Sequence, residues 1–149
     1  MAILLICLIG HAGLALLIPS PWLVPNLTLV GLVHAVGRAP QRWLVCSGLA
    51  GGFTVAWAIR FPGLLFAGVL ALGWVVHELA RRWDLSDARV QSLVVGSASL
   101  LASCGALWLD ALWSLPLLGL ACTHVAITGA AVPFVRGVAA LRARWRGIT

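Results

Sequence analysis

Charged residues are scarce in this sequence, and two common polar residue types are missing. The 149 residues include no lysine and no tyrosine, and only 9% of them are charged. The acids number four: Glu78, Asp84, Asp87 and Asp110. A soluble domain carries about 25% charged residues because its surface must face water. With 62% hydrophobic residues and a mean hydropathy of +1.05, much of this protein's surface must face lipid instead.

The sequence also lacks the residue combinations that catalysis and cofactor binding require. It has no Ser/His/Asp order, no glycine-rich phosphate loop and no paired carboxylates, and too few acids and bases for acid-base chemistry. His77-Glu78 resembles the start of the zinc-protease motif HExxH, but Arg81 stands where the second histidine is needed. We therefore predict that the chain is not an enzyme and has no cofactor, no metal and no small-molecule substrate.

Cysteine usage agrees with the absence of a metal site. Each cysteine lies in an apolar run, and none belongs to a CxxC pair or has the Cys/His spacing of a zinc site. We expect small buried side chains rather than a disulfide or metal ligands at Cys7, Cys46, Cys104 and Cys122.

The sequence does contain six apolar runs separated by short polar or proline-rich segments. A helix needs about 20 residues to cross a hydrocarbon core of roughly 30 Å, so six short spans use nearly the whole chain. We predict an all-α integral membrane protein, a compact bundle of six transmembrane helices over residues 1–135. The first run lacks the charged start of a signal peptide, so we expect it to remain as a helix. The predicted spans are 2–18, 23–37, 43–59, 63–80, 92–113 and 115–135, followed by a basic cytoplasmic tail over 136–149.

The arginines between these runs predict an orientation. Cytoplasmic loops of membrane proteins retain positive charge, and six spans leave only Arg60 on the opposite side from the other nine arginines. Both termini are therefore predicted to be cytoplasmic. Because these arginines lie in loops, the net charge of +6 indicates membrane orientation and not nucleic-acid binding. The nine are Arg38, Arg42, Arg81, Arg82, Arg89, Arg136, Arg142, Arg144 and Arg146.

Small residues recur at helical spacing in two of the spans. Helices in lipid associate through small residues that let backbones approach, and through hydrogen bonds. Gly48 and Gly52 are four residues apart in the third span, and Gly96, Ser99 and Ser103 follow one another in the fifth. Two interpretations stay open: contacts between helices of this chain, or a groove in which a helix of another protein docks.

Ionisable residues within a span are costly and therefore candidates for function. Glu78, near the end of the fourth span, can reach Arg81 or Arg82 one turn later. Asp110 is predicted at the same end of the bundle as Arg60, so we expect the two to pair or to reach interfacial water.

Two further expectations concern the histidines and the tryptophans. His11, His34, His77 and His124 fall one to a span, and we expect each to hydrogen-bond a neighbouring helix. Six of the eight tryptophans lie near predicted span ends, as an interfacial aromatic belt requires. Trp74 and Trp108 lie deeper, and we expect them to pack within the bundle.

Three segments resemble the rod shape-determining protein MreD family of bacteria. Family members are small six-span proteins in which a Pro-Asp/Asn-Leu sequence starts the second span, followed by a basic turn and a glycine-rich third span. The corresponding segments here are Pro25-Asn26-Leu27, residues 38–42 and residues 48–53 (GLAGGF). Many members carry an acid toward the end of the third span, where this chain has Val55-Ala56-Trp57-Ala58, so no role of that acid transfers.

The resemblance implies a non-enzymatic scaffold in the bacterial inner membrane. Such a protein would hold the membrane helix of MreC during cell elongation and lateral peptidoglycan synthesis. It would associate with the glycosyltransferase RodA and a class B transpeptidase. Two alternatives stay open: a substrate-binding component of an energy-coupling-factor vitamin transporter, and an accessory subunit of a respiratory or photosynthetic complex. The first is disfavoured because Ala2, Ala12 and Ala15 give no Ala-xxx-Ala pair in the first span.

Overall fold

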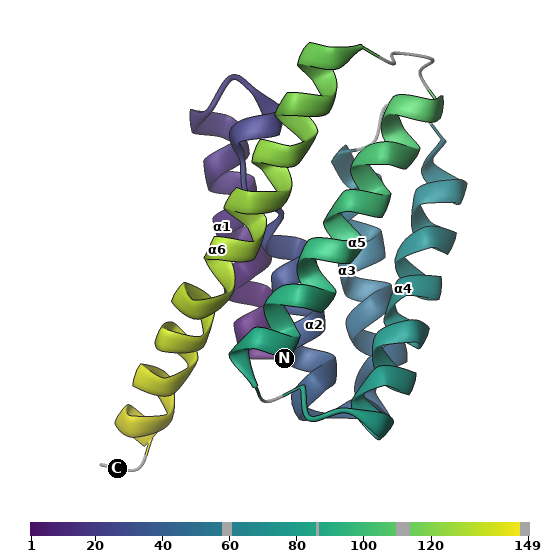
Figure 1. The fold of residues 1–149 in the computed structure, drawn as a ribbon. Helices are drawn as coiled ribbons and strands as arrows, with labels where there is room; N and C mark the ends of the chain where they lie inside the picture. Colours follow the sequence, from purple (N-terminus) through teal and green to yellow (C-terminus); the bar gives the residue numbers. More distant parts are fainter. Residues whose placement is uncertain (58–60, 86, 110–113, 147–149) are drawn as a thin grey trace.

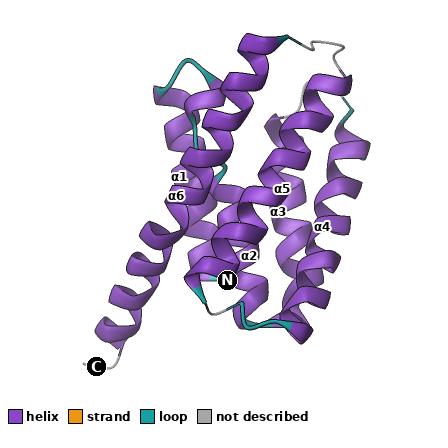
Figure 2. Cartoon of the chain, viewed as in Figure 1, coloured by secondary structure: helices purple, strands orange, loops and turns teal. Residues whose placement is uncertain are grey.

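The computed structural model describes residues 1–57, 61–85, 87–109 and 114–146, which form helices and contain no strand. Figures 1 and 2 show the helices running side by side in one bundle. The prediction of an all-α protein is therefore confirmed. The α-helices are α1 (Ala2–Leu17), α2 (Leu27–Arg38), α3 (Trp43–Trp57), α4 (Pro62–Arg82), α5 (Ala88–Leu109) and α6 (Leu115–Arg146), with 3-10 helices η1 (Pro21–Leu23) and η2 (Pro40–Arg42) on either side of α2.

The short helix α2 lies at the centre of the bundle. It contacts each of the other five α-helices, and every residue from Thr28 to Val36 is buried. A helix that is apolar on all sides belongs in a core rather than at a surface. Gly31 allows α1 to come close, because a Cβ added there would lie only 2.7 Å from the Cβ of Cys7.

Side chains from other helices hold both ends of α2. Asn26 caps its start, where the Asn26 side-chain oxygen accepts a hydrogen bond from the Leu29 N–H at 3.0 Å. The Asn26 N–H itself donates to Thr128 Oγ1 of α6 at 3.0 Å. His11 of α1 bonds the Pro25 carbonyl at 3.1 Å. The Asn26 contacts pair backbone N–H groups at the start of the helix, and His11 adds a second bond to the Pro25 carbonyl, which also accepts from the Leu27 N–H at 2.8 Å.

The far end and the middle of α2 are held in the same manner. His77 of α4 bonds the Pro40 carbonyl at 2.9 Å, and its ring lies against Trp43. In the middle, Gln91 Nε2 of α5 lies 3.4 Å from His34 Nδ1. All four histidines thus make a hydrogen bond to a neighbouring element, as the sequence predicts. His11 and His77 reach proline carbonyls beyond the ends of α2, and His124 of α6 bonds the backbone of Trp22.

Close packing of small residues joins α3 to α4. A Cβ added to Gly73 of α4 would collide with the Ser47 side chain of α3, and one added to Gly51 would lie 2.8 Å from the Phe66 ring. Helix association in lipid depends on such approaches, since lipid tails offer no hydrophobic drive for it.

The surface of the bundle is largely apolar. By length and composition, three helical stretches could each cross a membrane: Pro62–Arg82, Ala88–Trp108 and Leu115–Arg144; Ala2–Leu17 is a shorter apolar helix. Their large apolar side chains face outward, including Leu101 and Phe134. A monomer in water rarely exposes such extended apolar surface. These properties are those of a membrane protein.

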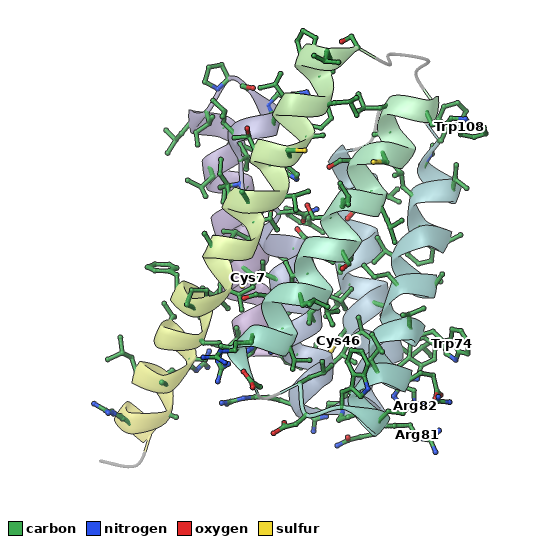
Figure 3. All side chains as sticks on the ribbon, viewed as in Figure 1. Cys7, Cys46, Trp74, Arg81, Arg82 and Trp108 are labelled. Atoms are coloured by element: carbon green, nitrogen blue, oxygen red, sulfur yellow. The ribbon has the colours of Figure 1, made fainter. Side chains whose placement is uncertain are left out.

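Two tryptophans and two cysteines are more exposed than the sequence predicts. Trp74 and Trp108, expected to pack inside, are 54% and 70% exposed and point away from the bundle in Figure 3. Cys7 and Cys46 are buried as expected, but Cys104 is half-buried and Cys122 exposed. The expectation of burial fails because an apolar side chain is equally well accommodated by lipid and by protein.

Within the described residues, helix boundaries differ from the predicted spans by four residues or more at three places. The helix α5 begins at Ala88 rather than residue 92. The helix α2 begins at Leu27 rather than residue 23, because Pro21 and Pro25 hold the preceding segment in η1 and an extended stretch. Its 12 residues rise only about 18 Å, less than the roughly 30 Å of a hydrocarbon core. The helix α6 does not stop near residue 135 but continues through Pro133 and the basic segment to Arg146.

The bond from Asn26 to Thr128 provides a test of how α2 is anchored. Thr128 is fully buried and bonds another element, whereas Thr123 on the same helix is exposed and bonds only its own Gly119 carbonyl at 3.0 Å. We predict that Thr128→Val lowers the stability by about 1–3 kcal/mol, because it leaves a buried N–H unpaired. Thr123→Val should stay within about 0.5 kcal/mol. Thermal unfolding in detergent measures both, and equal effects would contradict the anchoring.

Candidate functional site

The glycines Gly48 and Gly52 lie on a face of α3 that no other described part of the chain covers. A Cβ added to either one would meet nothing within 4 Å. Beside them stand apolar side chains that are open to the outside, Leu44 and Val45 at 59% and 58% exposure and Leu49 at 41%. The two glycines therefore lie among larger exposed apolar residues on the outside of α3. We call Leu44, Val45, Gly48, Leu49 and Gly52 the outer α3 face.

The opposite side of α3 explains why this face is left open. Residues three and four apart share one side of a helix, and Cys46, Ser47 and Ala50 are almost completely buried. They face the neighbours that α3 contacts most, α2 and α4. Because α3 has small residues on both sides, it packs closely inward and still presents two glycines outward.

The second predicted stripe has a different place in the fold. Ser99 and Ser103 of α5 are buried, and a Cβ added to Gly96 would lie 4.0 Å from Val125 of α6. Helices α5 and α6 contact each other along much of their length. The stripe formed by Gly96, Ser99 and Ser103 therefore lies within the bundle, and the two stripes do not form one site.

Of the predicted charged contacts, the structure shows one. Glu78 Oε1 lies 3.5 Å from Arg81 Nη1, and both side chains are well exposed. An exposed pair of this kind contributes little stability, about 0–1 kcal/mol. Arg82 extends from the same last turn of α4 (Figure 3). Arg60 and Asp110 lie outside the described residues.

Several of the arginines gather at one end of the molecule. Arg38 at the end of α2 and Arg142 of α6 line the same cavity. Figure 3 places Arg81 and Arg82 low in the view, the half in which the last turns of α6 lie in Figure 1. Arg89 lies in the first turn of α5, Arg42 is the last residue of η2, and Arg144 is exposed on α6.

A different cavity, of about 310 Å³, lies beside the segment that precedes α2. Its lining includes His11, Asn26 and His124, and the His124 ring meets Trp22 edge to face with centroids 6.2 Å apart. In the part of the chain that the structure describes, no three His, Cys, Asp or Glu side chains are grouped so as to hold a metal ion. Residues of α1, α6 and the η1 segment thus line this cavity together.

Two polar residues with a clear structural role were not singled out from the sequence. Gln91 reaches His34, and Thr128 accepts from Asn26. Each is a lone hydrogen-bonding residue among apolar neighbours, which is the signal that could have identified it. Their partners could not be found in this way, because the contacts join residues 57 and 102 positions apart.

No protein-family model, no curated protein and no solved structure matches this chain.

Proposed function

We propose that this protein is a non-enzymatic membrane scaffold that docks the membrane helix of a partner protein on the outer α3 face. One observation carries the proposal: Gly48 and Gly52, four residues apart on an apolar surface, have open space where their own chain could have placed a helix. Other described glycines that face open space, such as Gly68 and Gly105, have no second open glycine four residues away, so this pair is distinguished by its spacing.

The chemistry of this face suits a helix rather than a soluble ligand. Two glycines at this spacing let a second backbone approach closely, and the association gains from dispersion contacts that lipid cannot match. Val45 and Leu49 project beside the glycines and would fit against small residues on the incoming helix. A partner with a single membrane helix has the complementary shape.

The resemblance to the MreD family supports a specific partner set. In that reading the docked helix belongs to MreC, and RodA and a class B transpeptidase associate with the complex during lateral wall synthesis in the bacterial inner membrane. The Pro25-Asn26-Leu27 segment, on which the resemblance partly rests, starts and caps the central helix α2. A motif with that position would shape the whole bundle.

The same proposal includes six spans with both termini in the cytoplasm. Because α2 alone is too short, the second span would include η1 and the extended residues before α2, whose non-helical backbone is tolerated where protein surrounds it. The sorting of nine arginines to one side supports it. A green fluorescent protein fused after residue 149 should fluoresce, because that protein matures only in the cytoplasm, and alkaline phosphatase fused there should be inactive. A fluorescent-protein fusion that stays dark, together with an alkaline phosphatase fusion that is active, would contradict this orientation.

The docking face can be blocked without disturbing the bundle. We predict that Gly48→Leu together with Gly52→Leu weakens co-purification with MreC from the same organism at least about tenfold, since bulky side chains would hold the two backbones apart. The chain itself should fold normally, because both positions face open space and leucine favours a helix more than glycine does.

Gly68→Leu is the matched control. Gly68 lies on α4, is exposed, and also has nothing within 4 Å of an added Cβ. This variant should retain MreC at the level of the unmodified protein. Undiminished MreC recovery with the double variant, at equal expression and elution volume, would show that these glycines do not form the dock.

A further inference from the structure

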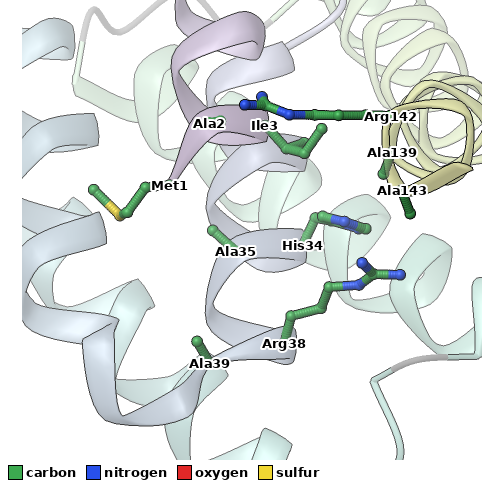
Figure 4. A pocket seen from close by; sticks show the side chains of 10 residues that line it. All are labelled: Met1, Ala2, Ile3, His34, Ala35, Arg38, Ala39, Ala139, Arg142 and Ala143. Carbon is green, nitrogen blue, oxygen red and sulfur yellow. The ribbon is translucent and has the colours of Figure 1, made fainter. Parts of the chain in front are cut away.

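A cavity of about 280 Å³ opens between the start of α1, the end of α2 and the C-terminal half of α6. Its charged and polar lining comes from His34, Arg38 and Arg142, and the alanines Ala35, Ala139 and Ala143 leave it room. Figure 4 shows His34 and Arg38 pointing from α2 toward α6, and Arg142 reaching from α6 toward the start of α1. Three side chains from two helices therefore line one space, with Arg142 at the α1 side and His34 and Arg38 at the α2 side.

His34 presents an unused hydrogen-bond donor at this cavity. The residue is only 4% exposed, and its Nδ1 lies 3.4 Å from Gln91 Nε2, which donates to it. A neutral imidazole carries one proton, so the proton must be on Nε2. Within the described residues His34 Nε2 is buried and has no partner. Because buried donors are almost always paired, an acceptor from outside the chain is the natural partner.

The electrostatics of the cavity favour an anion. No acid is among its lining residues, and neither Arg38 nor Arg142 forms an ion pair with any described side chain. Arg136, on the same helix as Arg142, has a buried guanidinium nitrogen, Nη1, that is also without a partner in the part of the chain that the structure covers. Guanidinium groups bind phosphate oxygens through paired N–H donors.

The position of the cavity identifies the source of the phosphate. Helix α6 begins at Leu115, so at 1.5 Å per residue Arg136 lies about 32 Å and Arg142 about 40 Å along it. A hydrocarbon core is roughly 30 Å thick, and the headgroup layers extend it to about 40–45 Å. If α6 enters the core near Leu115, its arginines reach headgroup depth. The exposed Phe134 and Leu141 lie on the same stretch, where acyl chains could contact them.

We propose that this cavity binds the phosphate of an anionic phospholipid, held by the guanidinium groups of Arg38 and Arg142 and by the Nε2–H of His34. A zwitterionic headgroup is disfavoured, since no acid lines the cavity to pair with a trimethylammonium group. The site does not depend on the docking role of the outer α3 face, which lies on a different helix.

The test uses the purified full chain in a neutral maltoside detergent, with short-chain phosphatidylglycerol, short-chain phosphatidylcholine and inorganic phosphate as separate probes. Binding is followed by native mass spectrometry and by the shift in thermal unfolding. We expect phosphatidylglycerol to bind at least about tenfold tighter than phosphatidylcholine, and Arg38→Gln with Arg142→Gln to weaken it at least about tenfold.

A charge-matched control separates a site from general attraction. Arg81→Gln with Arg144→Gln removes the same charge from exposed positions outside the cavity lining, and we expect it to change the affinity less than about threefold. A second pair of variants leaves every charge in place. Ala143→Leu fills the cavity mouth and should weaken binding, whereas Ala140→Leu, exposed and outside the lining, should not.

Each alternative outcome overturns the proposal. Equal losses in the two double arginine variants would mean that surface charge alone attracts the lipid. Binding of inorganic phosphate that depends on Arg38 and Arg142, without binding of phosphatidylglycerol, would assign the cavity to a free phosphate instead of a lipid. No difference between phosphatidylglycerol and phosphatidylcholine would rule out a site selective for anionic lipid.

Discussion

The structure depends on the burial of α2, a helix too short to cross a bilayer and apolar on every side. Such a helix is stable only if protein surrounds it and if the polar backbone beyond its ends finds partners. His11, Asn26 and Thr128 provide those partners at its start, and His77 provides one at its end. Few polar side chains are needed, because each bonds the backbone at or just beyond an end of α2, and His11, Thr128 and His77 tie it to neighbouring helices.

The packing of the other helices around α2 determines which of their sides stay uncovered. The most buried side chains of α3 face α2 and α4, so its second small-residue side points outward as the outer α3 face. Helix α6 contacts α2 and α5 and then extends past them, so its arginines stand over the end of α2 beside Arg38. The proposed docking face and the proposed lipid site are thus both consequences of packing around one central helix.

Much of the helix pattern could be predicted from the sequence, because prolines and arginines interrupt the apolar runs at Pro21, Pro40 and Pro62. The end of α6 could not be predicted in this way. Arginine favours a helix, so the basic segment after residue 135 is polar without being a helix end. The pair of Glu78 with Arg81 could be predicted, because the two residues are three positions apart on one helix.

The inward and outward sides of the helices were much harder to predict. In a soluble protein, apolar periodicity marks the buried side, but here both the core and the lipid accept apolar residues. Nothing in the sequence distinguishes Gly51, which contacts Phe66, from Gly52, which faces open space. For the same reason Trp74 and Trp108 were assigned to the interior although they point outward.

The central claim is that α3, and no other helix, presents the docking face for a partner. A photo-reactive amino acid placed in living cells at Leu49, on the outer α3 face, or at Trp74, on the outside of α4, tests it most directly. The account predicts a crosslink to the membrane helix of MreC from position 49 and only lipid adducts from position 74. A crosslink to MreC from position 74, with none from position 49, would contradict it.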